Sequence, residues 1–171
     1  MIKYIGAINL EVFRVRDILS IFTNDVILVP LAAWILAQLS KAVINLIIDR
    51  KFSFERLFGD GGMPSGHSAT VMALVVMVGW RAGFDSAAFA IALILAIVVM
   101  HDACGVRRET GKHAASIKEL TDAINLVLRE ASYEVRTERL KLLVGHTPLQ
   151  VFFGALLGAS VSTLYIVLFL I

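Results

Sequence analysis

The sequence has a single cysteine, Cys104, among its 171 residues. An intrachain disulfide is therefore excluded, and the cysteine usage gives no sign of an oxidising compartment. Net charge is nearly absent as well, since 16 Lys and Arg residues stand against 14 Asp and Glu residues. Proteins that bind nucleic acid usually carry a clear basic excess, so we expect no nucleic-acid partner. Cys104 is interpreted as a small buried thiol.

The first twenty residues lack the uninterrupted apolar core that a cleaved secretory signal needs, so we predict no such signal. The charged residues Glu11, Arg14, Arg16 and Asp17 interrupt them. Apolar residues recur instead at helical spacing: Ile5, Ile8, Val12, Val15, Leu19 and Phe22. This pattern predicts an N-terminal amphipathic helix that lies in the membrane interface or docks on the other helices.

Long apolar runs dominate the rest of the chain, and 58 % of all residues are hydrophobic. A helix needs about 20 mostly apolar residues to cross a bilayer. Four windows meet or approach this length: Val26–Ile48, Ser65–Trp80, Ser86–His101 and Val151–Ile171. We therefore predict an all-α, polytopic membrane helix bundle that forms one domain over residues 1–171. The second and third windows form a helical hairpin around Gly83, and Gly154 and Gly158 are assigned to helix packing.

With four crossings, the two polar connections Asp49–Pro64 and Asp102–Gln150 lie on the same side of the membrane. They hold eleven of the sixteen Lys and Arg residues. Cytoplasmic loops are enriched in these residues, which predicts a multi-pass protein of the bacterial inner membrane with this face in the cytoplasm.

Residues His113–Ala131 predict a surface helix on that face. One side of it is apolar and the other carries charge, the apolar residues being Ile117, Leu120, Ile124, Val127 and Leu128. Such a stripe can rest on the membrane, pack on the bundle or bind a partner. We favour packing or membrane contact, because apolar stripes are usually buried faces.

The residues Gly61-Gly62-Met63-Pro64-Ser65-Gly66-His67-Ser68-Ala69 stand where a polar loop enters a membrane helix. Glycines allow close backbone approach, and the N–H groups at a helix start form an anion site. His67 can there transfer a proton to a bound phosphate ester. The simpler alternative is a glycine-rich helix cap with an incidental histidine.

A second histidine motif, Gly145-His146-Thr147-Pro148-Leu149-Gln150, precedes the last membrane helix. Gln150 lies four residues after His146, so the two side chains share a face if the helix has begun at His146. An amide oxygen that accepts the imidazole N–H would fix the tautomer and present the other nitrogen as a nucleophile. A polar helix cap explains this motif equally well.

Basic side chains accompany both motifs. Arg107 and Arg108 offer planar forks for phosphate oxygens, and Asp102 can orient one of them or a histidine; they also suit a role as membrane anchors. Lys41 shares a helix face with Gln38 and Asn45 inside the first window. A lysine within a membrane span is costly and indicates function, unless it merely extends toward the interface.

Three motifs together resemble the type-2 phosphatidic acid phosphatase and vanadium haloperoxidase superfamily. They are the Pro64-Ser65-Gly66-His67 signature, Asp102–Arg108 with Gly111, and Gly145–Pro148. The resemblance is to its divergent branch of small bacterial and plastid membrane proteins, and it extends over nearly the whole chain. It implies metal-independent hydrolysis of a phosphate ester, with no cofactor. By this resemblance, His146 attacks phosphorus, His67 protonates the leaving oxygen, and Ser65, Gly66 and basic residues hold the phosphate.

The chain departs from the superfamily at two places. The candidates for the basic residues of the superfamily's first motif are Lys41, Lys51 and Arg56, but their spacing does not match that of the motif. In the third motif, Leu140 and Gln150 replace an arginine and an aspartate. Arg107 or Arg108 can supply the cation, but an amide cannot stabilise an imidazolium by charge. We therefore include Asp102 among the catalytic candidates as a compensating carboxylate.

The sequence thus predicts a membrane phosphatase that acts on a lipid phosphate or pyrophosphate through a phosphohistidine. The phosphate ligands would be Lys41, Arg56, Ser65, Gly66, Arg107 and Arg108, with Gln150 orienting His146. The alternative is a non-catalytic membrane protein that binds anionic lipids or scaffolds a partner. Apart from lipids no partner is indicated, and a homo-oligomer stays open.

Overall fold

The computed structural model describes residues 18–49, 62–128 and 145–171. Within these ranges the chain forms helices joined by short connections, and no strand occurs there. A 3₁₀ turn, η1, covers Ser20–Thr23. The helices are α2 (Asp25–Asp49), α4 (Gly66–Ala82), α5 (Ala87–Cys104), α6 (Val106–Leu128) and α7 (Pro148–Phe169). The N-terminal amphipathic helix was predicted mostly on residues outside the described ranges.

Membrane-spanning length is reached by three of the described helices. These are α2, the continuous run of α5 and α6, and α7. The fourth expected crossing, α4, has 17 residues, which is the lower limit of the usual range. The all-α membrane bundle is confirmed, and the chain is an integral membrane protein.

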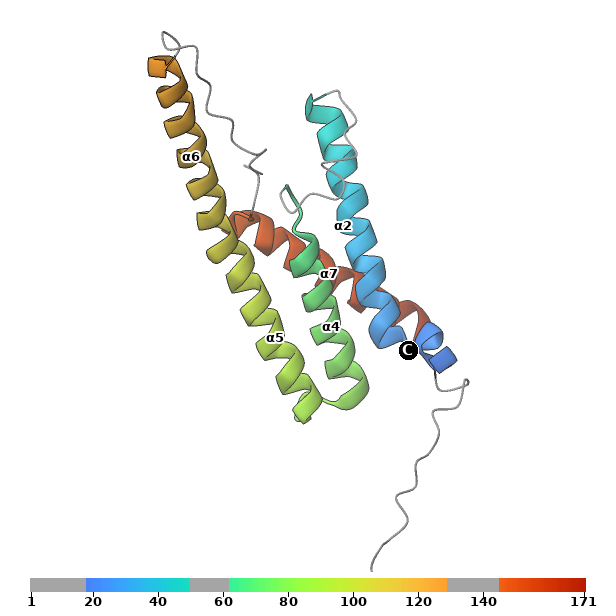
Figure 1. The fold of residues 1–171 in the computed structure, drawn as a ribbon. Coiled ribbons are helices and arrows are strands. Elements are labelled where there is room, and N and C mark those ends of the chain that lie inside the picture. The colour runs from blue at the N-terminus through green and yellow to red at the C-terminus, as the bar shows by residue number, and fades with distance from the viewer. Residues whose placement is uncertain (1–17, 50–61, 129–144) are drawn as a thin grey trace, which may run out of the picture.

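Helix α4 lies at the centre and packs against α2, α5 and α7 (Figure 1). Small residues on it allow this close packing, because their side chains leave room for neighbouring backbones. Its buried residues are Gly66, Ser68, Ala69, Val71, Ala73, Val75, Met77 and Gly79. The start of α4, where the first histidine motif stands, is therefore enclosed by other helices.

Two glycines set the spacing between α7 and α4. A Cβ atom on Gly158 would lie 2.1 Å from the Ala69 carbonyl oxygen, and one on Gly154 would lie 2.3 Å from that of Ser65. Real Cβ atoms do not approach so closely, so only glycine fits at both positions. The two residues have the packing role that their spacing predicted.

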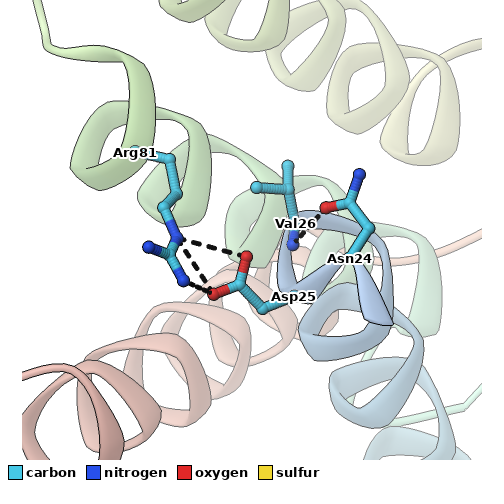
Figure 2. A network of polar contacts seen from close by, with 4 residues as sticks. All are labelled: Asn24, Asp25, Val26 and Arg81. Atoms are coloured by element: carbon cyan, nitrogen blue, oxygen red, sulfur yellow. Dashed lines mark hydrogen bonds and ion pairs between the residues drawn. The ribbon is translucent and has the colours of Figure 1, made fainter. Parts of the chain in front are cut away.

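The far end of the bundle is closed by a hairpin and an ion pair. Gly83, with φ +90°, ends α4, and Ser86 caps α5 by accepting the Phe89 N–H. Arg81 at the end of α4 forms a forked pair with Asp25 at the start of α2 (Figure 2). The Asn24 side chain accepts the Val26 N–H beside it (3.0 Å). The Arg81 side chain is about half exposed, so solvent screens the pair and its contribution to stability is small.

Helix α6 begins at Val106, seven residues before the predicted start of the surface helix. It continues the direction of α5 beyond the ends of α4 and α7 (Figure 1). Among the described helices, α6 contacts α5 and no other. The expected packing of its apolar stripe on the bundle is therefore not seen within the described residues.

Candidate functional site

Ser65 begins the site by capping α4. Its Oγ accepts the Ser68 N–H (3.3 Å) and the Ser68 hydroxyl (3.0 Å), and the residue is fully buried. Its own N–H donates to the Gln150 carbonyl oxygen (3.0 Å). Helix α4 starts at Gly66, two residues after Pro64. The first histidine motif is thus bonded directly to the start of α7, where the second one lies.

Gly145 and His146 attach to the junction of α5 and α6. The His146 N–H donates to the Ala103 carbonyl oxygen (2.8 Å). Gly145 has φ +90°, and a Cβ atom there would lie 2.4 Å from the Arg108 backbone nitrogen. Two conditions therefore require glycine at this position, the positive φ and the contact with another backbone. Three motifs far apart in sequence meet here.

The imidazole of His146 is buried, with 2 % of the residue exposed. Its Nδ1 lies 3.3 Å from Oε1 of Gln150, and that oxygen also accepts the Thr147 N–H (3.0 Å). Gln150 completes a capping box at the start of α7. When Nδ1 carries the proton it donates to Gln150, and Nε2 then holds a lone pair.

Nε2 of His146 is buried and has no hydrogen-bond partner among the described residues. A buried polar atom without a partner is uncommon in proteins and often indicates a functional role. The ring of His67 lies beside it, with centroids 6.2 Å apart and planes at 65°. One histidine can therefore attack an atom while the other exchanges a proton with a group bound to it.

Charge and burial around His146 favour its neutral form. Burial lowers the pKa of the imidazole most, whereas the hydrogen bond to Gln150 raises it. Positive charge at Lys41 and His67 lowers the pKa further. The nearby backbone of Gly62 raises it, although no contact of Nε2 with it meets the distance and angle of a hydrogen bond. The net shift of the pKa is downward, which favours the neutral imidazole.

Lys41 lies within α2 and is 3 % exposed. Its side chain passes Gly62, where a Cβ atom would lie 3.7 Å from Lys41 Cδ. Gln38 lies one turn earlier on α2, and a Cβ atom on Gly66 would lie 3.9 Å from its Cδ. The Oε1 atom of Gln38 is buried without a hydrogen-bond partner in the described ranges. Gln38 shares its helix face with Lys41, but was not among the predicted site residues.

Asp102 and Arg107 form an ion pair (Oδ2 to Nε, 2.8 Å), and both side chains are 41 % exposed. The sequence left either an arginine or a histidine as the partner of Asp102, and its described ion pair is with an arginine. Arg108 is exposed, and its backbone supports Gly145. Arg56 and Lys51 lie outside the described ranges. Among described residues, no three His, Cys, Asp or Glu side chains are grouped to hold a metal ion.

The fold and the site together define a class, a helical membrane protein in which two histidines from separate motifs lie in edge-to-face contact. The Divergent PAP2 family matches residues 22–161, and the chain belongs to that family. It is similar to an uncharacterized membrane protein, YuiD, of Bacillus subtilis (strain 168). The two are 40 % identical over 146 residues, which cover 82 % of this chain and 92 % of YuiD. No solved structure matches it. The family resemblance stated from the motifs is confirmed.

Proposed function

We propose that the protein hydrolyses a lipid phosphate or pyrophosphate through a phosphohistidine on His146. The observation that carries the proposal is the buried Nε2 of His146, which has no hydrogen-bond partner among the described residues and belongs to a ring whose centroid lies 6.2 Å from that of His67. Family membership supports a phosphatase-related protein of the membrane. The particular reaction and the residue roles are our inference.

The first step is an in-line displacement at phosphorus. Nε2 of His146 forms a bond to phosphorus as the bond to the leaving oxygen breaks, and protonated His67 gives its proton to that oxygen. Nδ1–H stays bonded to Gln150 and holds the ring in place. The proposed ligands of the phosphate oxygens are Lys41, Arg56, Ser65, Gly66, Arg107 and Arg108.

In the second step water attacks phosphorus and His67 takes its proton. The bond from phosphorus to Nε2 breaks, inorganic phosphate leaves, and both histidines return to their starting forms. Because the site lies at the end of membrane helices with exposed apolar sides, a head group can enter while the acyl or prenyl chain stays among the helices.

Gln150 favours a second candidate function, binding of an anionic lipid without turnover. Its Oε1 is shared by the Thr147 N–H and His146. A neutral amide orients the ring but gives no charge stabilisation to the imidazolium that forms. A site of this kind can hold phosphate and turn it over slowly or not at all.

Gln150→Glu separates these two functions. Glutamate is as suitable as glutamine at this position of a capping box, so α7 keeps its start. The carboxylate stabilises the imidazolium, and we expect phosphate release to rise about tenfold or more. The carboxylate also raises the pKa of His146, so the pH below which activity is lost moves upward. In the wild type that pH lies below the ordinary imidazole pKa of about 6.5.

The measurement is phosphate release from phosphatidate, phosphatidylglycerophosphate and a polyprenyl pyrophosphate in mixed micelles, across pH. Gln150→Ala is the matched control, because it removes the cap and the imidazole partner together, and it should be slower than the wild type. If neither the wild type nor Gln150→Glu hydrolyses any of the three, the enzyme proposal fails and lipid binding is the better account.

We further propose that the site faces the cytoplasm in a bacterial inner membrane, on the basis of Lys and Arg placement. In a Cys104→Ala background, His113→Cys on α6 should react with a membrane-impermeant maleimide only after cells are opened. Asp85→Cys, in the turn at the opposite end of the bundle, should react in intact cells. The reverse pattern would assign the site to the outer face.

A further inference from the structure

Helix α6 carries an apolar stripe that the described structure leaves uncovered. Ile117, Leu120, Ile124 and Val127 are 47 %, 64 %, 47 % and 77 % exposed. The covered side of α6 is a different one, since the residues shielded from solvent are small or polar: Gly111, Ala114, Thr121 and Asn125. The stripe is therefore not the face that the chain uses for its own packing in these ranges.

The bilayer cannot cover this stripe in the arrangement seen. Counted as one helix, α5 and α6 run for 41 residues, from Ala87 to Val127. A bilayer takes up about 20 of them. α6 continues the direction of α5 (Figure 1). If α5 supplies the spanning length, the remaining length therefore projects beyond the bilayer along the same line.

The spacing of the stripe matches a coiled-coil seam. Its four residues follow one another at intervals of 3, 4 and 3, which are the a and d positions of two heptads. Isoleucine occupies both a positions, and leucine and valine occupy the d positions. A β-branched residue at a with leucine at d favours two parallel strands.

Membrane insertion imposes that same geometry on two copies of this chain. Copies with the same topology expose α6 on the same side and in the same direction, so their α6 helices can pair only in parallel. We propose that the protein is a homodimer in which the α6 helices of two copies pair along Ile117, Leu120, Ile124 and Val127. The twofold axis then stands along the membrane normal.

Charge placement permits this self-association. The residues that flank the seam are uncharged, namely Ser116, Thr121 and Ala123, so two identical helices meet without like charges in contact. The charged residues Lys118, Glu119 and Asp122 occupy outer positions and are exposed. Two heptads are a short seam, but anchoring both helices in one membrane raises their effective concentration.

Cysteine cross-linking tests the dimer in native membranes. Leu120→Cys in a Cys104→Ala background places two thiols across the seam, near the separation that a disulfide accepts. Mild oxidation should convert most of the protein to a covalent dimer. The matched control Asp122→Cys, on the opposite side of the same helix, should stay monomeric.

Ile124→Asp added to Leu120→Cys should abolish the cross-link, because a charge enters the seam, while the protein still inserts in the membrane. The same substitution should halve the mass of the purified protein in light scattering. Cross-linking equal at positions 120 and 122 would reflect random collision and overturn the proposal. A Leu120→Cys protein that stays monomeric would also overturn the proposal, whether its thiol is shielded by lipid or covered by another protein.

Discussion

His146→Gln is expected to lower phosphate release from the lipid substrate by about three orders of magnitude or more, since loss of a nucleophile removes the covalent route. Glutamine has nearly the volume of histidine, so the buried position stays filled. The backbone bond from residue 146 to Ala103 does not involve the side chain and is retained. The variant should therefore fold and insert as the wild type does.

The intermediate itself can be trapped with a substrate labelled in its phosphate. Rapid quenching should show a labelled protein whose bond is labile in acid and stable in alkali, as a phosphoimidazole is, and His146→Gln should show none. His113→Gln on exposed α6 is the matched control and should retain full activity. Equal release by the wild type and His146→Gln would disprove the mechanism.

Gly158→Ala should weaken the whole bundle, because its methyl group would lie 2.1 Å from the Ala69 carbonyl oxygen. The clashing oxygen belongs to the backbone and cannot move by a change of rotamer, so α7 must move away from α4. Overpacking of this kind typically costs about 1–3 kcal/mol in the free energy of unfolding. For a chain of this size each kcal/mol lowers the melting temperature by roughly 2–4 °C.

Thermal unfolding in detergent, followed by circular dichroism, measures this loss. Ser160→Thr adds one methyl group to the exposed side of the same helix and should melt as the wild type does. Gly154→Ala should lose activity as well as stability, since it pushes on Ser65, whose N–H is bonded to Gln150. An unchanged melting temperature for Gly158→Ala would show that the two helices do not pack as described.

The helices and their boundaries were largely predictable from local pattern. Apolar runs predicted α2, α5 and α7 to within a few residues, and Gly83 predicted the hairpin. The start of α6 was missed because the residues from Arg107 to Lys112 include no apolar side chain and lie before the apolar stripe. They are helical because α6 continues α5 with only Gly105 between them.

The site was predictable in its residue types but not in its connections. The sequence predicted that Gln150 would meet His146, and the two do meet. The basis differs from a shared helix face, because α7 begins at Pro148 and the contact forms at its capping box. No local pattern indicates that Gly145 packs on Arg108, or that Ser65 donates to Gln150 across 85 positions. Gln38 was missed as a site residue because its importance depends on the distance to Gly66 in another helix.

A single amide oxygen on Gln150 serves both the end of a helix and the ring of His146, the proposed nucleophile. Each time the first turn of α7 frays, the Thr147 N–H and His146 lose their shared acceptor in the same event. The orientation of the imidazole therefore follows a local opening equilibrium of the helix end. Hydrogen exchange at the Thr147 amide becomes a direct measure of how often the ring is held for attack.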